Sequence, residues 1–316
     1  MSETVAVGTK VFTRDGQLRQ LLESVPSVVD TVYVADDGEP TELKERIYSA
    51  DYAFTLEVID MEYDAGLGAG RATIVERLSE DFLAIVDTDH RFPPNFEALL
   101  DVLRTEKRLG GVAGAIVEPD RDRYYVEAQD FAENGTALVR SPTLEDKNIE
   151  MVGRHPIVRF DFVPNAALFR RECVEDYCWD PAYVIEQEHA DFYVGHWRRT
   201  DWTFAICPSV VFEHYPGGDE TYLRERGSLQ KERTSQRYFL KKWGYERDDS
   251  ESFVWAEGGK VPNPSPSTLE WVGRRYTEHG MSTTIRLSLE HLLRLGGGSA
   301  KRLLRRLLAP EQHCQT

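Results

Sequence analysis

The sequence predicts an α/β fold in which a mixed, mostly parallel sheet is sandwiched by helices. Two observations support this prediction. Short apolar runs alternate with helix-like stretches over the first 120 residues, as expected when each strand is followed by a crossover helix. Each predicted strand also ends in polar residues. Because ligands of open α/β sheets bind beyond the carboxyl ends of the strands, a functional site is expected at this end of the sheet.

The elements of this first half follow one another regularly. The predicted strands are residues 4–8, 31–35, 54–59 and 82–86. The predicted helices are residues 17–24, 42–49, 71–79 and a segment to about Arg108 that Pro93 and Pro94 open.

The second half is less regular. Residues 111–169 are predicted to form further strands with turns, residues 172–197 are mainly helical, residues 204–212 form a strand, and residues 222–243 form an Arg-rich helix. Beyond Gly244 the composition changes, with three prolines between 262 and 266 and a Gly triplet at 296–298. We therefore predict a body of residues 1–245, divided into halves at residue 120, and an extension of residues 246–316.

Charge and composition exclude several classes of protein. The 316 residues include 54 acidic and 38 basic side chains, for a net charge of -16, and 41% are hydrophobic. This apolar content excludes a disordered chain, and the acidic excess argues against nucleic acid as the main partner. Only nine basic residues are lysines, and an acid-rich, Lys-poor surface resembles that of proteins from salt-loving archaea.

The cysteines and the N-terminus indicate the compartment. The four cysteines form neither a CxxC pair nor a dense framework, so we expect reduced thiols. No signal peptide opens the chain, and no apolar run approaches the ~20 residues that span a bilayer. A cytoplasmic protein is therefore expected.

The sharpest local feature is the pair of carboxylates Asp87 and Asp89, which follows the buried-type strand at 82–86. Such a pair at a strand end can hold a hard divalent cation, and that cation can bridge two phosphates. Alone, this spacing is a weak signal in an acidic chain. Its place after a strand strengthens it.

Other segments accompany this pair in a fixed order along the chain. They are Thr9 to Arg14, Asp36-Asp37-Gly38-Glu39, Gly66 to Arg71, Asp87-Thr88-Asp89, Val163 to Arg171, Glu186 to Phe192, and Val211 to His214. With these segments, residues 4–243 resemble glycosyltransferase family two and its GT-A relatives. Together with the acid-rich, Lys-poor composition, the resemblance implies a member of haloarchaeal type. The resemblance implies a GT-A fold with a Rossmann-like, nucleotide-sugar-binding half at 1–120 and an acceptor-binding half at 121–245.

The same resemblance implies roles for individual residues. Contacts to the donor nucleotide are expected from Thr9, Arg14, Asp37, Arg71 and Asp87. A Mn²⁺ or Mg²⁺ ion is expected on Asp87, Asp89 and His214, where it would stabilise the charge that develops on the leaving phosphate. The predicted activity is inverting, metal-dependent transfer of a sugar from a UDP- or GDP-linked donor to a glycan acceptor.

The catalytic base stays open between three residues. Inversion requires a carboxylate or similar group to take the proton of the incoming hydroxyl. Most family members have Glu-Asp at this point, with the Asp as base, whereas this chain has Glu188 and His189. Glu188, His189 and Asp191 are therefore all candidates.

Two other functions remain in view. A sugar-nucleotide pyrophosphorylase shares the nucleotide-binding architecture, but it should show a Gly-rich loop near the first strand, and residues 8–14 are not Gly-rich. A non-catalytic nucleotide- or glycan-binding protein on the same scaffold is the second alternative.

The C-terminal segment is basic, whereas the chain as a whole is acidic. Residues 286–308 contain six basic residues and one Glu, together with nine leucines, eight of which follow an amphipathic pattern. Such pieces can lie on an anionic membrane surface. We therefore expect peripheral contact with the cytoplasmic face of the membrane, and an acceptor such as a dolichol-phosphate-linked oligosaccharide that serves N-glycosylation of surface glycoproteins. A helix docked on the body is the alternative.

Overall fold

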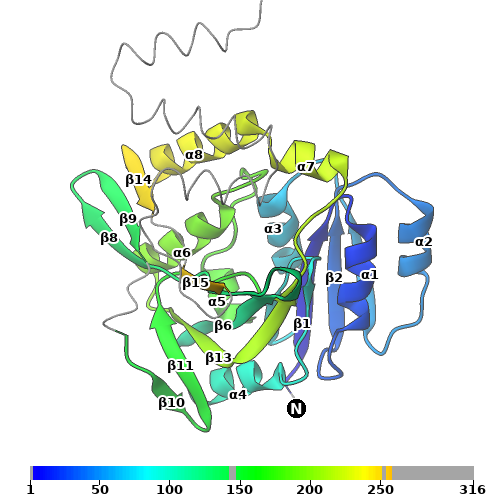
Figure 1. Ribbon diagram of the computed structural model, residues 1–316, viewed down its shortest axis with the longest axis horizontal. Coiled ribbons are helices and arrows are strands. Elements are labelled where there is room, and N and C mark those ends of the chain that lie inside the picture. Colours follow the sequence, from blue (N-terminus) through cyan, green and yellow to red (C-terminus); the bar gives the residue numbers. More distant parts are fainter. Residues whose placement is uncertain (1–2, 142–146, 251–253, 258–316) are drawn as a thin grey trace, which may run out of the picture. The chain divides into compact units, whose positions relative to one another are not determined.

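The body of the protein is a large mixed β-sheet with helices on both faces (Figure 1). The structure is a computed structural model, and it describes residues 3–141, 147–250 and 254–257. The predicted α/β class is confirmed. The predicted helical extension with residues 286–308 lies outside the described residues.

The first half forms the parallel part of the sheet. Its strands are β1 (Val5–Val11), β2 (Thr31–Asp36), β3 (Thr55–Asp60) and β4 (Phe82–Ile85). Its helices are α1 (Asp15–Glu23), α2 (Glu42–Tyr48) and α3 (Leu67–Arg77). β1 pairs in parallel with β2 and β4, and β2 pairs in parallel with β3. Parallel pairs need crossover connections, which these helices supply.

The second half extends the same sheet. Its elements are β5 (His90–Arg91), α4 (Glu97–Thr105), β6 (Leu109–Glu118), β7 (Arg123–Val126), β8 (Asp130–Asn134), β9 (Ala137–Ser141), β10 (Glu150–Val152), β11 (His155–Phe160), β12 (Ala167–Arg170), α5 (Arg171–Asp176), α6 (Glu188–Arg199), β13 (Thr203–His214), α7 (Glu220–Arg226), α8 (Leu229–Trp243), β14 (Arg247–Ser250) and β15 (Val254–Glu257). β14 and β15 pair with β9 and β7, within one compact unit that spans Met1–Pro262.

The strand order brings several carboxyl ends to one edge. The long path through the sheet is β10-β11-β13-β6-β12-β4-β1-β2-β3. β12 is antiparallel to both β4 and β6, and β13 is parallel to β6. Strands β1, β4, β6 and β13 therefore run in the same direction, and the residues that follow them meet at one edge of the sheet.

Two hydrophobic cores separate the helices into layers. One core joins α1, α2 and α4 to one face of the sheet, and the other joins α3, α5, α6 and α8 to the opposite face. Alternate residues of β1 and β2 enter different cores: Val32 and Val34 pack on one side, and Tyr33 and Ala35 on the other. This double burial explains the continuous apolar runs of these strands.

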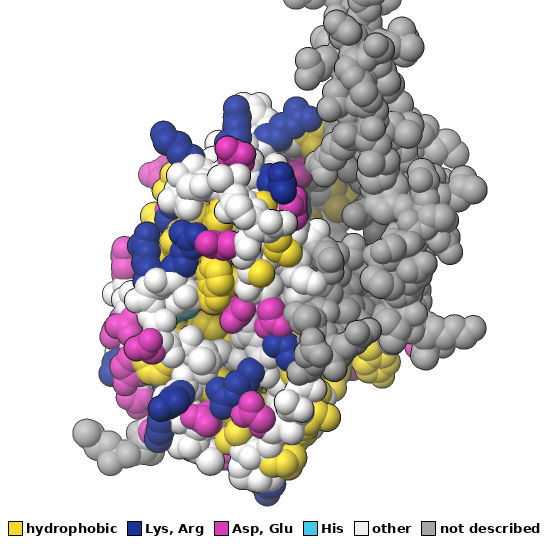
Figure 2. Space-filling model, turned by 90° about the vertical axis from the view of Figure 1, so that its left-hand side faces the viewer, with side chains coloured by type: hydrophobic (Ala, Val, Ile, Leu, Met, Phe, Trp, Pro, Cys, Tyr) yellow, Lys and Arg dark blue, Asp and Glu magenta, His cyan; other side chains and the backbone are white. Residues whose placement is uncertain are grey.

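A second, three-stranded sheet of β8, β9 and β14 lies beside the main one. Ion pairs cross it, such as Arg140 with Asp248 at 2.6 Å. Figure 2 views the molecule from this side and shows acidic and basic side chains next to one another. The negative charge of the chain is thus partly compensated locally on this face.

The structure divides two helices that the sequence predicts as longer ones. The segment 222–243 is interrupted at Gly227 and Ser228, because the Ser228 side chain caps the new helix by accepting from the Lys231 amide. The segment 172–197 is likewise divided into α5 and α6 by an irregular stretch of residues 177–187. This stretch forms part of the site.

The Gly-rich segment is used for close packing of two loops. The amides of Leu67 and Gly68 donate to the carbonyls of Val184 and Tyr183, both at 2.9 Å. A Cβ on Gly68 would lie only 2.1 Å from the carbonyl oxygen of Asp180. These helix N-terminal amides are therefore occupied by protein carbonyls, and the glycines allow the backbones to meet.

We predict that Gly68→Ala destabilises the fold by about 1–3 kcal/mol, because a backbone carbonyl must move to admit the methyl group. Gly16→Ala is the matched control, since nothing lies within 4 Å of a Cβ at that helical position. Urea unfolding of the two variants measures the difference. Equal stability of both variants would contradict the packing role of Gly68.

Candidate active site

A cavity of about 290 Å³ opens where β1, β4 and β13 end. Six of the side chains singled out from the sequence line it: Arg14, Arg71, Asp87, Asp89, Glu188 and His214. Helix α7 contributes Tyr222 and Arg226 to the lining, and Figure 1 places this helix beyond the carboxyl ends of β1 and β2. A larger hollow of about 480 Å³ lies between α1 and α2, but none of the predicted site residues lines it.

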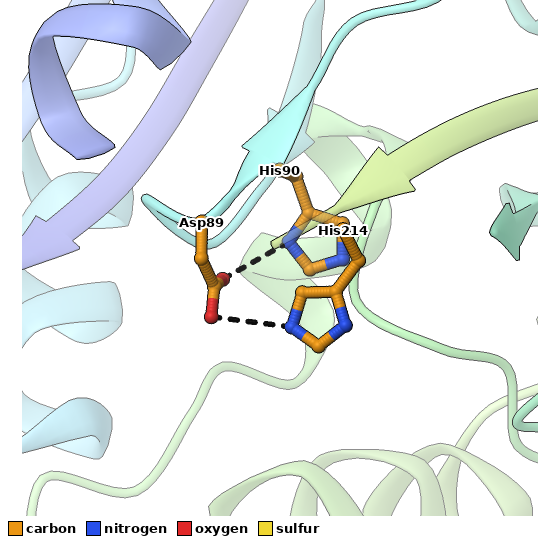
Figure 3. A group of neighbouring side chains, drawn as sticks. All are labelled: Asp89, His90 and His214. Carbon is orange, nitrogen blue, oxygen red and sulfur yellow. Dashed lines mark hydrogen bonds and ion pairs between the residues drawn. The ribbon is translucent and has the colours of Figure 1, made fainter. Parts of the chain in front are cut away.

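Asp89, His90 and His214 form one compact group, whose possible ligand atoms all lie within 4.8 Å of one another (Figure 3). His214 Nε2 lies 3.2 Å from Asp89 Oδ2, and His90 Nδ1 lies 3.3 Å from Asp89 Oδ1. The pairing of β5 with β13 sets His90 opposite His214, and the two rings stack with centroids 4.6 Å apart.

Within this group, Asp89 is held in its negatively charged form and His214 in its positively charged form. Burial opposes the charge on Asp89, but hydrogen bonds from His214 and His90 and the charge of Arg14 hold the pKa of Asp89 well below its usual range. Burial would lower the pKa of His214, yet its hydrogen bonds to Asp89 and Glu118 raise that pKa to about 9. Without metal, His214 is therefore an imidazolium at pH 7.

Asp87 is bound to two other side chains. Its Oδ1 lies 3.2 Å from Arg71 Nη2, and its Oδ2 accepts from Asn165 Nδ2 at 2.9 Å. Burial would raise the pKa of Asp87, but the charges of Arg71 and His90 and the hydrogen bond from Asn165 together outweigh it, so the pKa is lowered. Of the three predicted metal ligands, Asp89 and His214 thus lie in the compact group, whereas Asp87 lies against Arg71.

Arg71 connects the two halves of the site. It is buried, and its Nη1 donates to Glu188 Oε1 at 2.9 Å. The other carboxylate oxygen of Glu188 is buried and has no hydrogen-bond partner in the part of the chain that the structure describes. Glu188 is the first residue of α6, and the two residues before it, Glu186 and Gln187, have φ values of 60° and 64°. Positive φ is uncommon outside glycine, so this strained turn fixes where α6 starts.

The other two candidate bases are occupied by structural contacts. The side chain of Asp191 is fully buried and accepts hydrogen bonds from four donors: Tyr177, Tyr183, Lys242 and Trp243. His189 is bonded through Nε2 to the Val163 carbonyl at 3.1 Å, and burial lowers its pKa to about 3. Neither residue lines the cavity.

Arg14 lies between Asp89 and α7. Its Nη1 is 2.5 Å from Asp89 Oδ2, and its guanidinium lies 3.7 Å from the centre of the Tyr222 ring. At the other end of α7, Arg226 forms an ion pair with Glu186 at 3.0 Å. These contacts hold α7 over the cavity.

Thr9 and Asp37 are buried behind the lining residues. Asp37 Oδ1 forms an ion pair with Lys10 Nζ at 2.6 Å, and its Oδ2 accepts from the Gly66 amide. Lys10 lines the cavity, and burial lowers its pKa against the opposing charge of Asp37. Thr9 Oγ1 has no hydrogen-bond partner among the described residues.

The structure adds four residues to the predicted set. Lys10 and Asn165 lie within segments that carry the resemblance, and His90 directly follows Asp89, so their positions in the sequence could have pointed to them. Glu127 follows β7 and belongs to no motif; burial, with the nearby charge of Asp87, raises its pKa to about 7. Only the three-dimensional arrangement identifies Glu127.

A family model described as "Glycosyl transferase family 2" matches residues 7–178, just over half of the chain. The chain belongs to glycosyl transferase family 2. This membership confirms the predicted family and the class of enzyme, a glycosyltransferase, and sets aside the pyrophosphorylase alternative.

Two curated relatives cover most of the chain. Beta-1,4 N-acetylgalactosaminyltransferase 1 from Homo sapiens is 28% identical over 264 residues, and the protein of the same name from Mus musculus is 27% identical over 263 residues. Both matches cover 76% of this chain and 46% of the relative. The glycosyltransferase thus spans about half the length of the curated relatives it matches.

A solved structure agrees in fold. The crystal structure of S. aureus TarS 1-349 superposes with a TM-score of 0.51 at 12% identity, covering 75% of this chain and 64% of that chain. This likeness supports the GT-A fold.

Among the described residues of the glycosyltransferase, no helix is long and apolar enough to cross a membrane.

We predict that the metal-free enzyme loses stability as the pH rises from 6.5 to about 9. The raised pKa of His214 means that the folded state binds a proton more tightly than the unfolded state, so the stabilisation is complete below pH 6.5 and is lost as the pH passes the folded pKa. The expected fall in the free energy of unfolding is on the order of 2–3 kcal/mol. Urea unfolding in EDTA measures it, and a His214→Gln variant with the same pH dependence as the wild type would contradict it.

Proposed function

We propose that this glycosyltransferase moves a sugar from a UDP- or GDP-linked donor to a hydroxyl of a glycan acceptor, with inversion and with the help of a divalent cation. The observation that carries the proposal is the compact group of Asp89, His90 and His214, in which Asp89 and His214 line a cavity together with Lys10, Arg14 and Arg71. In a chain of net charge -16, such a concentration of cationic side chains fits an anionic ligand.

The residues of this group fit a divalent cation. Asp89 Oδ1 lies 3.3 Å from His90 Nδ1, and the second ring nitrogen of His90, Nε2, is buried without a hydrogen-bond partner among the described residues. One carboxylate with two imidazoles suits Mn²⁺ better than Mg²⁺, which prefers oxygen ligands. Asp89, His90 and His214 would hold the ion. A bound cation neutralises the charge that develops on the leaving phosphate.

The basic side chains around the group supply the remaining donor contacts. Arg14 already approaches Asp89, so a diphosphate in the cavity would lie within reach of its guanidinium. Arg71 and Lys10 are held in place by the carboxylates Asp87 and Asp37, which fixes their positive charges at the cavity wall. Asp87 would remain available to ribose hydroxyls, since its side chain is 35% exposed and lines the cavity.

Glu188 is the proposed base. Its free Oε2 would take the proton of the acceptor hydroxyl as that oxygen attacks the anomeric carbon and the bond from this carbon to the phosphate oxygen breaks. Arg71 holds the opposite oxygen, Oε1, and so orients the carboxylate. The saturated contacts of Asp191, and the bond of His189 to the Val163 carbonyl outside the cavity lining, favour Glu188 over these two residues.

The names of the two curated relatives suggest the first sugar to test. Both are called beta-1,4 N-acetylgalactosaminyltransferases, so a nucleotide-linked N-acetylgalactosamine leads the donor panel. The panel is scored by nucleotide release and by thermal stabilisation with and without Mn²⁺. Donor binding without nucleotide release for any acceptor would favour the alternative, a non-catalytic binding protein.

For the acceptor we propose a lipid-linked glycan at the cytoplasmic face of a membrane, such as a dolichol-phosphate-linked oligosaccharide in N-glycosylation. The basic, leucine-rich sequence of residues 286–308 motivates this proposal. We expect the full chain to sediment with anionic vesicles and a chain ending near residue 283 to stay in the supernatant. Identical partition of both chains would remove the membrane part.

We predict that Asp89→Ala abolishes metal-dependent donor binding, because the variant lacks the one carboxylate of the compact group. Calorimetry with UDP and GDP, each in the presence of Mn²⁺, measures the affinity. Asp101→Ala, at an exposed position away from the cavity, is the control. Wild-type affinity in Asp89→Ala would exclude this metal site.

We predict that Glu188→Gln lowers kcat by a factor of about 10²–10⁴ while the donor affinity changes little, since general base catalysis contributes roughly this much. Glu186→Gln is the matched control two residues earlier, where the carboxylate instead pairs with Arg226. Single-turnover kinetics separates the chemical step from binding. A normal kcat in Glu188→Gln would move the base to another residue.

A further inference from the structure

We infer that Glu118 is a positioning residue that fixes the tautomer of His214 and thereby sets how tightly the site binds its cation. The inference rests on the proposed metal site of Asp89, His90 and His214. It concerns the opposite side of the His214 ring, which faces away from Asp89.

The sheet register places Glu118 beside His214. β6 and β13 are parallel, and Val117 is the partner of Glu213, so the next residues on both strands are neighbours at the carboxyl edge. His214 Nδ1 lies 3.0 Å from Glu118 Oε1, while Nε2 of the same ring lies 3.2 Å from Asp89. The imidazole is thus held between two carboxylates, one at each nitrogen.

Glu118 cannot readily leave this position. Its side chain is only 2% exposed. Its second oxygen, Oε2, accepts from Arg123 Nη2 at 2.6 Å and Nε at 3.0 Å, and from Arg121 Nη1 at 3.3 Å. Arg123 lies opposite Glu118 in the antiparallel pair of β6 and β7, so the hairpin itself orients the carboxylate.

This arrangement decides which nitrogen is free to bind a cation. A neutral imidazole carries one N–H and one lone pair, and a metal needs the lone pair. A carboxylate accepts hydrogen bonds and cannot donate them, so each ring nitrogen carries a proton while Glu118 and Asp89 both face the ring. A cation held by Asp89 would take the place of the Nε2 proton, and Glu118 would keep the remaining proton on Nδ1, which leaves the Nε2 lone pair to the cation.

Glu118→Gln is a sharp test because glutamine has the size of glutamate but can also donate a hydrogen bond to His214 Nδ1. The two arginines require an acceptor, so the amide oxygen of the glutamine would take the place of Oε2 and its NH₂ group would face His214 Nδ1. The amide would then donate to Nδ1 and move the ring proton to Nε2, where it blocks the cation. Glu118→Ala removes the partner without imposing either tautomer.

The experiment measures the Mn²⁺ affinity of the full chain by electron paramagnetic resonance of the free ion at pH 8. We expect about 10–100-fold weaker binding in Glu118→Gln, at least as weak as in Glu118→Ala. Glu213→Gln is the matched control, since the neighbouring Glu213 is exposed and bonded to Tyr215; it should bind like the wild type. A merely structural Glu118 would reverse the order of the two variants, because alanine is the larger change.

Mn²⁺ binding by Glu118→Gln within twofold of the wild type would overturn the inference while leaving the metal site intact. A wild type that binds no Mn²⁺ would overturn both the metal site and the inference. A second measurement needs no variant: ¹⁵N NMR of the wild type loaded with Cd²⁺ should show coupling of the metal to His214 Nε2 and a protonated Nδ1. Coupling through Nδ1 would overturn the inference as well.

Discussion

The buried guanidinium of Arg71 joins the two halves of this glycosyltransferase at the point where the chemistry is proposed to occur. It comes from α3 in the first half, and it contacts Asp87 after β4 and Glu188 at the start of α6 in the second half. A buried charge without partners is costly, so each of these three side chains needs the others. The position of α6 relative to the sheet therefore depends on this one cation.

The same requirement organises the rest of the site. The parallel strands end in carboxylates, and burying them at one edge demands positive charge close by. Lys10 forms an ion pair with Asp37, and Arg123 forms one with Glu118. Asp89 is paired with Arg14 and with the two histidines. A strongly acidic protein thus gathers Lys10, Arg14 and Arg71 where an anionic donor would arrive, so these cations neutralise carboxylates of the fold and are also available to the ligand.

The sequence was sufficient for the order of most elements and for six of the residues that line the cavity, because these depend on local patterns. Apolar runs predicted the strands. The position of Asp87 and Asp89 just after one of these strands predicted that both carboxylates belong to the site. The sequence did not indicate which distant segments pair with one another. His90 joins the compact group only because β5 pairs with β13, and Glu118 reaches His214 only through the register of β6. The four donors around Asp191 include two from α8, some fifty residues further along the chain, so no local pattern indicated that this carboxylate is saturated.

The contact between the Gly-rich segment and residues 183–184 has a consequence for how such a protein can diversify. Backbone hydrogen bonds tie two loops that lie more than a hundred residues apart in the chain, and one of them leads directly into Glu188. An insertion or deletion in either loop would shift Glu188 against Arg71. New acceptor preferences are therefore expected to arise by changes of length elsewhere in the chain.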